Sequence, residues 1–192
     1  MIDNEYKNIA LKIAENFGYE SEHSNHVARL SLQLFRQLAA LHNLGGEYGN
    51  LLECAAILHD TGYYISAFKH HIHSYRIIMD SDFEGLSSEK KKIIALTARY
   101  HRKKMSSEPD NKSFLKLKKL DRKKVLMLAA LIRIADGLDY SHRCAVEKIY
   151  CEIDASAVRL DCLPAKSFNS EIKQALKKSD LFKLVFKKKI VI

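Results

Sequence analysis

Residues that interrupt regular secondary structure are scarce in this sequence. Its 192 residues include only 7 glycines and 2 prolines, and tryptophan is absent. So few turn-forming residues favour long helices over an all-β architecture with many tight turns. Hydrophobic residues make up 47% of the chain, which is enough for a packed core and argues against global disorder. A chain of this length is expected to form one compact domain with a small appendage.

The cysteines also exclude two common kinds of site. No pair among Cys54, Cys144, Cys151 and Cys162 has the spacing of a Cys-x-x-Cys motif. This argues against a zinc cluster and a thioredoxin-like site, and free thiols are typical of a reducing cytosol. No run of about 18 apolar residues is present, and the N-terminus lacks the apolar segment of a signal peptide. The sequence therefore predicts a cytoplasmic protein without a membrane-spanning segment.

Positive charge predominates, with a formal net charge of +9 at pH 7. Such an excess suits an anionic partner, although solubility alone is an equally good explanation. No nucleic-acid-binding motif accompanies the charge. We therefore expect a phosphorylated small molecule or polyphosphate as the partner, and leave nucleic acid and a homodimer open.

Apolar residues recur at helical spacing over the first part of the chain. The pattern predicts helices at about residues 3–17, 21–41, 48–60, 70–80, 87–101 and 121–136. From residue 144 the pattern instead predicts two short strands, a helix at about 169–178 and a β-rich end from Leu184 to Val191. We expect a helical body at 1–143 and a small α+β subdomain at 144–192 packed on it. The polar, Lys-rich residues 102–120 are predicted as a loop.

Four side chains place metal-binding groups on apolar helix faces. His23 lies four residues before Val27 and continues the apolar stripe of its helix, while His59 and Asp60 end the next helix. Asp136 is in phase with the apolar stripe of the last predicted helix. An ionised carboxylate on a buried face is costly unless it is paired or bound to a metal. Because imidazole and carboxylate groups on packed helices form divalent-metal sites, we predict one here.

Further polar residues are candidates to extend this site. His73 and His101 would add metal ligands, and with them a second ion could bind about 3.5–4 Å from the first. The alternative is that these two histidines contact the phosphate of the substrate or form hydrogen bonds to the ligands. Asp139 would orient a ligand histidine through a hydrogen bond, with a surface acid as the alternative. His26 and His42 are interpreted as solvent-facing or secondary positions.

Two basic stretches accompany these residues. Four cations at the end of the fifth predicted helix are candidates to bind phosphate, with a solvated helix end as the alternative: Arg99, Arg102, Lys103 and Lys104. Residues 112–124 are also rich in lysine. We expect this second stretch to lie near the mouth of the metal site, where it would attract a polyanion, with a solvated linker as the alternative.

Several motifs resemble a known family. The order His23, His59-Asp60, Asp136 resembles the H…HD…D pattern of the HD superfamily, an all-helical fold of metal-dependent phosphohydrolases. Longer motifs resemble the C-terminal region of the exopolyphosphatase/guanosine pentaphosphatase (Ppx/GppA) family over nearly the whole chain: Gly62-Tyr63, His71-Ile72-His73-Ser74, Arg99-Tyr100-His101-Arg102-Lys103 and Ile134-Ala135-Asp136-Gly137-Leu138-Asp139.

The resemblance implies a mainly α, HD-type helical bundle. It carries over the ligands His23, His59, Asp60 and Asp136, with His73 and His101 as accessory residues. In that family the phosphatase chemistry belongs to N-terminal actin-like domains, which this sequence does not include, so exopolyphosphatase activity does not carry over.

The expected function is hydrolysis of a phosphoester or phosphoanhydride through a metal-activated water, with His59 and Asp60 as catalytic groups. The expected cofactor is one or two divalent ions per chain (Mn, Mg, Fe, Co, Ni or Zn). The first alternative is a non-catalytic module that binds polyphosphate, an alarmone or RNA. The second is a protein-interaction or dimerisation unit.

Overall fold

The computed structural model describes residues 3–105, 107, 109, 111–164 and 169–192. Its first part is helical: α1 (Asp3–Asn16), α2 (Ser21–Gln37), α3 (Ala39–His42), α4 (Glu47–Leu58), the 3-10 helix η1 (Thr61–Tyr64), α5 (His70–Asp80), α6 (Ser88–Arg99), α7 (Lys112–Leu115) and α8 (Lys119–Gly137). Its second part mixes strands and helices: β1 (Val146–Ile153), β2 (Ala157–Pro164), α9 (Asn169–Lys178), α10 (Asp180–Phe186) and β3 (Lys189–Val191). The predicted mainly helical fold with a small C-terminal α+β part is confirmed. Within the described residues, no helix has the length and hydropathy needed to cross a membrane.

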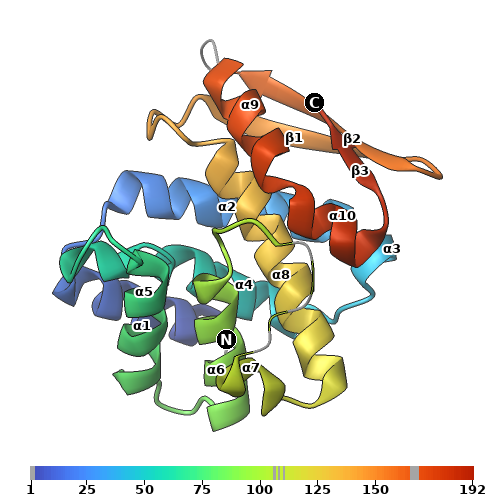
Figure 1. The fold of residues 1–192 in the computed structure, drawn as a ribbon. Coiled ribbons are helices and arrows are strands. Elements are labelled where there is room, and N and C mark those ends of the chain that lie inside the picture. The colour runs from blue at the N-terminus through green and yellow to red at the C-terminus, as the bar shows by residue number, and fades with distance from the viewer. Residues whose placement is uncertain (1–2, 106, 108, 110, 165–168) are drawn as a thin grey trace.

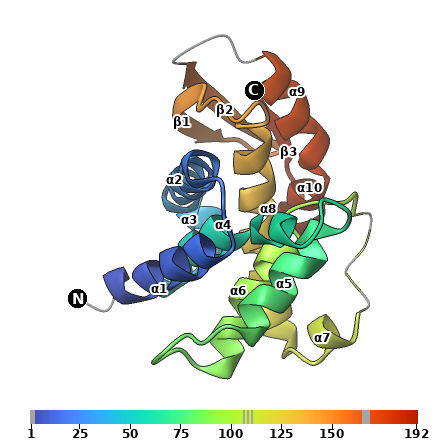
Figure 2. The same cartoon turned by 90° about the vertical axis from the view of Figure 1, so that its left-hand side faces the viewer.

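Helix α8 runs through the centre of the molecule and connects its two parts. It contacts α2, α4, α6, α9 and α10, while α1 lies against α4, α5 against α6 and the sheet against α2 (Figures 1 and 2). A single hydrophobic cluster includes Leu131 of α8, Ile149 of β1 and Phe182 of α10. The division of the chain into domains at residue 143 therefore stays a prediction.

The apolar stripes explain how α2 and α8 are placed. On α2, Val27, Leu30 and Leu34 are fully buried, and His23 continues their face with an exposed fraction of 1%. Helix α8 is buried on all sides from Val125 onward, because neighbouring helices pack on one face and the C-terminal part covers the other. These two helices thus carry polar side chains into the interior at positions that follow an apolar stripe.

The sheet is small and has the strand order β1-β2-β3. Strands β1 and β2 form an antiparallel hairpin, and β3 pairs in parallel with β2. The outer edge of β1 is covered by two glutamine side chains of α2. Gln33 accepts a hydrogen bond from Ile149 N (2.9 Å) and donates to Glu147 O (3.2 Å). Gln37 accepts from Cys151 N (2.9 Å) and donates to Ile149 O (2.6 Å), so both amides bond β1 as a neighbouring strand would.

Three predicted boundaries differ from the structure. The predicted β-rich end is wrong before residue 189, because α10 includes Leu184 and the strand β3 spans only Lys189–Val191. Leu181 and Phe182 are adjacent and both fully buried, which suits a helix packed on α8 better than a strand with alternating faces. Helix α2 ends at Gln37, and α3 follows. The predicted loop at 102–120 contains α7 and the start of α8, and its residues 106, 108 and 110 lie outside the described residues.

Candidate metal centre

A close contact between η1 and α5 begins the site. A Cβ atom on Gly62 would lie only 2.1 Å from the carbonyl oxygen of His70, so glycine is required where the turn after α4 meets α5. The hydroxyl of Ser74 accepts a hydrogen bond from Gly62 N (2.9 Å) and donates to His59 O (2.6 Å). These contacts hold the turn that carries Asp60 against the first turn of α5.

Six side chains from five helices or helix ends converge beside this contact. They form two groups, and within each group the ligand atoms lie within 4.8 Å of one another: His23, His59 and Asp136, and Asp60, His70 and His101. Asp60 lies between the groups. Its Oδ2 atom is 3.4 Å from His59 Nε2 and 3.9 Å from His23 Nε2, whereas its Oδ1 atom is 3.0 Å from His70 Nε2 and 3.4 Å from His101 Nε2.

Hydrogen bonds at the Nδ1 atoms, on the side away from the cluster, fix the orientation of three imidazoles. His59 Nδ1 and His101 Nδ1 each donate to the carbonyl oxygen of the residue three positions earlier, at 2.6 Å and 2.7 Å. His23 Nδ1 donates to Asp139 Oδ2 at 2.8 Å. Because these oxygens only accept, the proton of the neutral ring lies on Nδ1. Each ring therefore turns the Nε2 lone pair toward the centre of the cluster.

This arrangement leaves hydrogen-bond acceptors facing one another. His23 Nε2 and His59 Nε2 are buried and have no hydrogen-bond partner among the described residues, whereas Asp60 Oδ1 lies 3.0 Å from His70 Nε2. His23 Nε2 also lies 3.8 Å from Asp136 Oδ1. Burying unpartnered acceptors costs free energy unless a cation compensates them. The donor set of imidazole nitrogens and carboxylate oxygens thus fits a divalent transition metal.

The protonation states agree with that fit. Burial lowers the pKa of His59 and of His101, so both rings are neutral near pH 7. Burial alone would raise the pKa of Asp60, but the surrounding imidazoles outweigh it and hold the pKa well below its usual range. For Asp136, Lys178 outweighs the same effect of burial and lowers the pKa. His23 differs, because Asp139 and the other carboxylates outweigh burial and raise the pKa of this ring.

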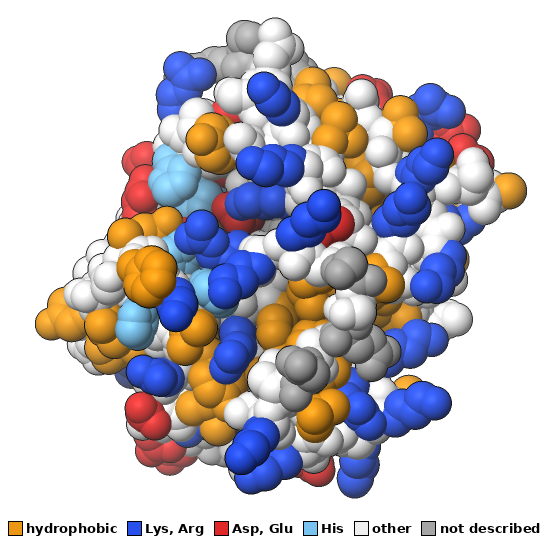
Figure 3. Space-filling view, in the orientation of Figure 1, with side chains coloured by type: hydrophobic (Ala, Val, Ile, Leu, Met, Phe, Trp, Pro, Cys, Tyr) orange, Lys and Arg blue, Asp and Glu red, His pale blue; other side chains and the backbone are white. Residues whose placement is uncertain are grey.

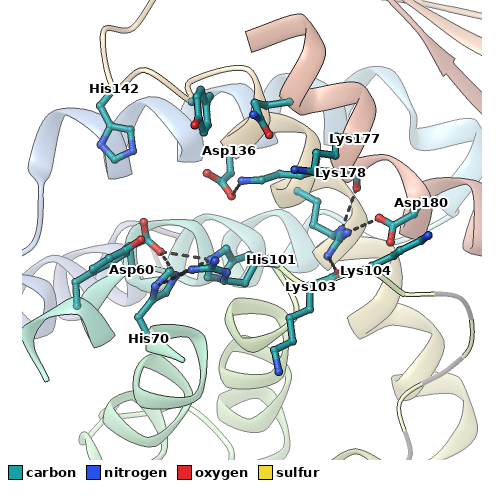
Figure 4. A pocket seen from close by; sticks show the side chains of 15 residues that line it. Asp60, His70, His101, Lys103, Lys104, Asp136, His142, Lys177, Lys178 and Asp180 are labelled. Carbon is teal, nitrogen blue, oxygen red and sulfur yellow. Dashed lines mark hydrogen bonds and ion pairs between the residues drawn. The ribbon is translucent and has the colours of Figure 1, made fainter. Parts of the chain in front are cut away.

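A cavity of about 660 Å³ opens beside the cluster and has cationic walls (Figures 3 and 4). One wall comes from the segment after α6, with Arg102, Lys103 and Lys104, and the opposite wall comes from α9, with Lys177 and Lys178. Lys178 Nζ forms an ion pair with Asp136 Oδ2. Cationic side chains from two segments therefore border the cavity that leads to the centre.

The predicted ligands lie together, with one exception. His23, His59, Asp60, Asp136 and His101 all belong to the cluster. His70 takes the place that was expected for His73, which belongs to neither group of metal-binding side chains among the described residues. Residues three positions apart on a helix lie on the same face, about 60° apart in direction and about 4.5 Å apart along the axis, so helical periodicity does not distinguish His70 from His73. The contact at Gly62 selects His70, and the helical pattern alone contained no signal of that contact.

The other predicted residues have mixed outcomes. Asp139 is fully buried and accepts a hydrogen bond from His23, so the alternative of a surface acid is wrong, while its role in orienting a metal ligand stays a prediction. Arg99 does not line the cavity, although the three cations that follow it do. The interpretation of His26 and His42 as solvent-facing is wrong, because both are 4% exposed.

The expectation for residues 112–124 is also wrong. Lys118 and Lys119 lie at the start of α8, whereas Asp136 lies near its end, about 25 Å along the helix axis. The sequence analysis also missed Lys177 and Lys178. Nothing in their local pattern indicates that α9 folds back on the end of α8. Gly137 permits that packing, since a Cβ atom there would lie 2.5 Å from Ala175 Cα.

Comparisons with known proteins agree with this fold. Residues 7–184 match the family described as Ppx/GppA phosphatase, domain III. The chain is also similar to a guanosine-5'-triphosphate,3'-diphosphate pyrophosphatase from Pseudoalteromonas atlantica (strain T6c / ATCC BAA-1087), with 28% identity over 123 residues. That similarity covers 62% of this chain and 24% of the relative, so the chain spans about a quarter of the relative's length. The family match extends from α1 to α10 and includes all six side chains of the cluster, and the chain therefore belongs to the Ppx/GppA phosphatase domain III family.

Proposed function

We propose that this chain is a metal-dependent phosphohydrolase of the HD superfamily that acts on a phosphoester or phosphoanhydride. The observation that carries the proposal is the pair of ligand groups with Asp60 between them. One carboxylate oxygen of Asp60 faces His23 and His59, and the other faces His70 and His101. Asp60 would therefore hold a divalent ion together with either pair of histidines, and sites with two metal ions are common in phosphoryl transfer.

The residues of the centre have separate roles in this proposal. A bound divalent ion supplies Lewis-acid polarisation of a phosphoryl oxygen and lowers the pKa of a water molecule. Asp139 holds the proton on His23 Nδ1 and so keeps the Nε2 lone pair directed inward. His142 stacks on the His23 ring at 3.8 Å and shields it from solvent on that side. Asp60 and Asp136 remain ionised and counter the charge of bound cations.

The cationic walls support a substrate with more than one negative charge. Lys103 and Lys104 border the cavity on one side and Lys177 borders it on the other. Fixed cations beside a phosphoryl group stabilise the charge that develops on its oxygens. A nucleotide or a polyphosphate-like molecule fits this chemistry, and the relative from Pseudoalteromonas atlantica is named as acting on a guanosine polyphosphate.

The test combines metal analysis with hydrolysis. Purified full chain loaded with Mn²⁺, Co²⁺ or Ni²⁺ is analysed for metal and assayed for phosphate release from nucleotides and tripolyphosphate. Asp60→Ala is expected to lose metal and at least about a hundredfold in activity, because a bridging ligand is removed. His73→Ala is the matched control, since His73 lies on α5 outside the cluster. Equal activity of the two variants, or a wild type that releases no phosphate with any metal, would refute the proposal.

The alternative function is a binding module for polyanions. The observation that favours it is the ion pair between Lys178 and Asp136, in which a lysine of this chain already neutralises one proposed ligand. A binding module retains affinity for tripolyphosphate after chelation of metal and after Asp60→Ala, and it releases no phosphate. The proposed hydrolase loses turnover in both cases.

A further inference from the structure

A second cavity lies on the other side of the segment that follows α6. Its volume is about 480 Å³, and it shares Arg102, Lys103 and Lys104 with the cavity of the metal centre. Arg99 lines this second cavity only, and its guanidinium group lies 5.2 Å from the centre of the Tyr75 ring, which supports it by a cation–π contact. Four cationic side chains therefore border one cavity, and no acidic side chain borders it within the described part of the chain.

A buried histidine completes the lining. His71 is 5% exposed, and its Nδ1 atom has no hydrogen-bond partner among the described residues. His70 and His71 are neighbours on the first turn of α5, so their side chains diverge by about 100°. His70 consequently faces the metal centre, while His71 faces the second cavity. The same turn presents the N-terminal, positive end of the α5 dipole to this space.

The electrostatic environment of His71 is uniformly positive. Arg99, Arg102 and Lys103 border the same cavity as His71. No carboxylate borders that cavity among the described residues. A neutral imidazole can donate one N–H group to an anion, and the surrounding cations would neutralise the charge of that anion.

From the cavity, the four cations and the unpartnered imidazole, the structure assigns a second oxyanion site to the space between α5 and the end of α6. Its ligand is a phosphate group, which is either free inorganic phosphate or the terminal group of a longer polyanion. The site does not depend on the proposed hydrolysis, because none of the six metal-binding side chains lines it. Arg102, Lys103 and Lys104 separate the two cavities, so a phosphate group bound here draws on the cations that also serve the metal centre.

Calorimetric titration of the full chain in the presence of a chelator tests this site without requiring catalysis. Inorganic phosphate and tripolyphosphate are the two probes. Arg99→Gln is compared with Arg76→Gln, which removes the same charge from an exposed position of α5 that borders neither cavity. Arg99→Gln is expected to weaken binding at least about tenfold, since a charge-assisted hydrogen bond to phosphate contributes that much. Arg76→Gln is expected to bind as wild type does.

The two probes distinguish the sources of the phosphate group. Weaker binding of both probes by Arg99→Gln identifies free phosphate as a sufficient ligand. Weaker binding of tripolyphosphate alone identifies the end of an extended ligand that reaches across both cavities. A histidine-ring NMR signal that shifts with phosphate in wild type and is lost in His71→Gln supports the same site. Equal affinity of Arg99→Gln and Arg76→Gln for both probes overturns the assignment.

Discussion

Arg133 connects the two cationic walls of the metal-centre cavity, because it forms hydrogen bonds with both the end of α9 and the segment after α6. It is 2% exposed, and its Nε atom donates to Lys178 O (3.0 Å) at the end of α9. Its Nη1 atom donates to Lys103 O (2.5 Å) in the segment after α6, and its Nη2 atom pairs with Asp180. Replacement by methionine, Arg133→Met, keeps a stem of similar length and removes all of these bonds.

The cost follows from what remains buried. Removing one partner of a buried ion pair typically costs about 3–5 kcal/mol. The Asp180 side chain is 19% exposed, so water can solvate part of its charge, and we expect the lower end, about 3 kcal/mol. For a domain of this size 1 kcal/mol corresponds to about 2–4 °C, and the melting temperature should fall by about 6–12 °C.

Urea unfolding followed by circular dichroism measures this change, with Arg76→Met as the exposed control on α5. The control should change the free energy of unfolding by less than about 0.5 kcal/mol. The double variant Arg133→Met/Asp180→Leu should recover part of the loss, because no charge is then left without its partner. If Arg133→Met were as stable as the control, the assignment of Arg133 as the joint between the walls would be wrong.

Three further predictions test other parts of the structure. Asp139→Asn replaces one of the two acceptor oxygens of Asp139 with a donor, so the proton of His23 is no longer held on Nδ1. Metal affinity, measured by competition with a metal indicator, should therefore fall about 10–100-fold. Unchanged affinity would exclude this role of Asp139. Burial lowers the pKa of His42 below 6.5 in the folded state, so the unfolded chain binds a proton first as pH falls and stability is lost in that range. His42→Gln should therefore lose less stability between about pH 7.5 and about pH 5.5 than wild type in urea titrations, and an equal loss would contradict the reasoning. Gly137→Ala should lower the free energy of unfolding by about 1–3 kcal/mol and alter metal binding, because the added Cβ atom would meet the backbone of α9. Gly45→Ala is the control and should leave the free energy of unfolding unchanged, because a Cβ atom there has open space.

The helices and most residues of the candidate metal centre were predictable because both follow one periodicity. On α2 and α8 the apolar stripe defines the buried face, and a polar residue on that stripe is carried into the interior. His23 and Asp136 were found in this way. His70 of α5 was not, because its place beside Asp60 depends on the close contact with Gly62, and the pattern of a single helix does not contain contacts between segments.

The errors at the C-terminal end have a related cause. Lys178 lies 42 residues after Asp136 and reaches it only because α9 packs against α8. The basic stretch at 112–124 adjoins the site in sequence, but the length of α8 separates it from the site in space. Proximity along the chain was thus a poor guide to proximity in the fold wherever a long helix lies between two segments.

The glutamines of α2 have a consequence for how this protein behaves at high concentration. An open sheet edge is a surface on which another chain can add a strand and begin aggregation. Here Gln33 and Gln37 already occupy the backbone groups of β1 at residues 147, 149 and 151, and the opposite edge strand β3 has only 3 residues. A foreign strand would have to displace a packed helix to pair with β1. The β1 edge of the sheet is therefore protected from strand addition without a barrel and without a further strand.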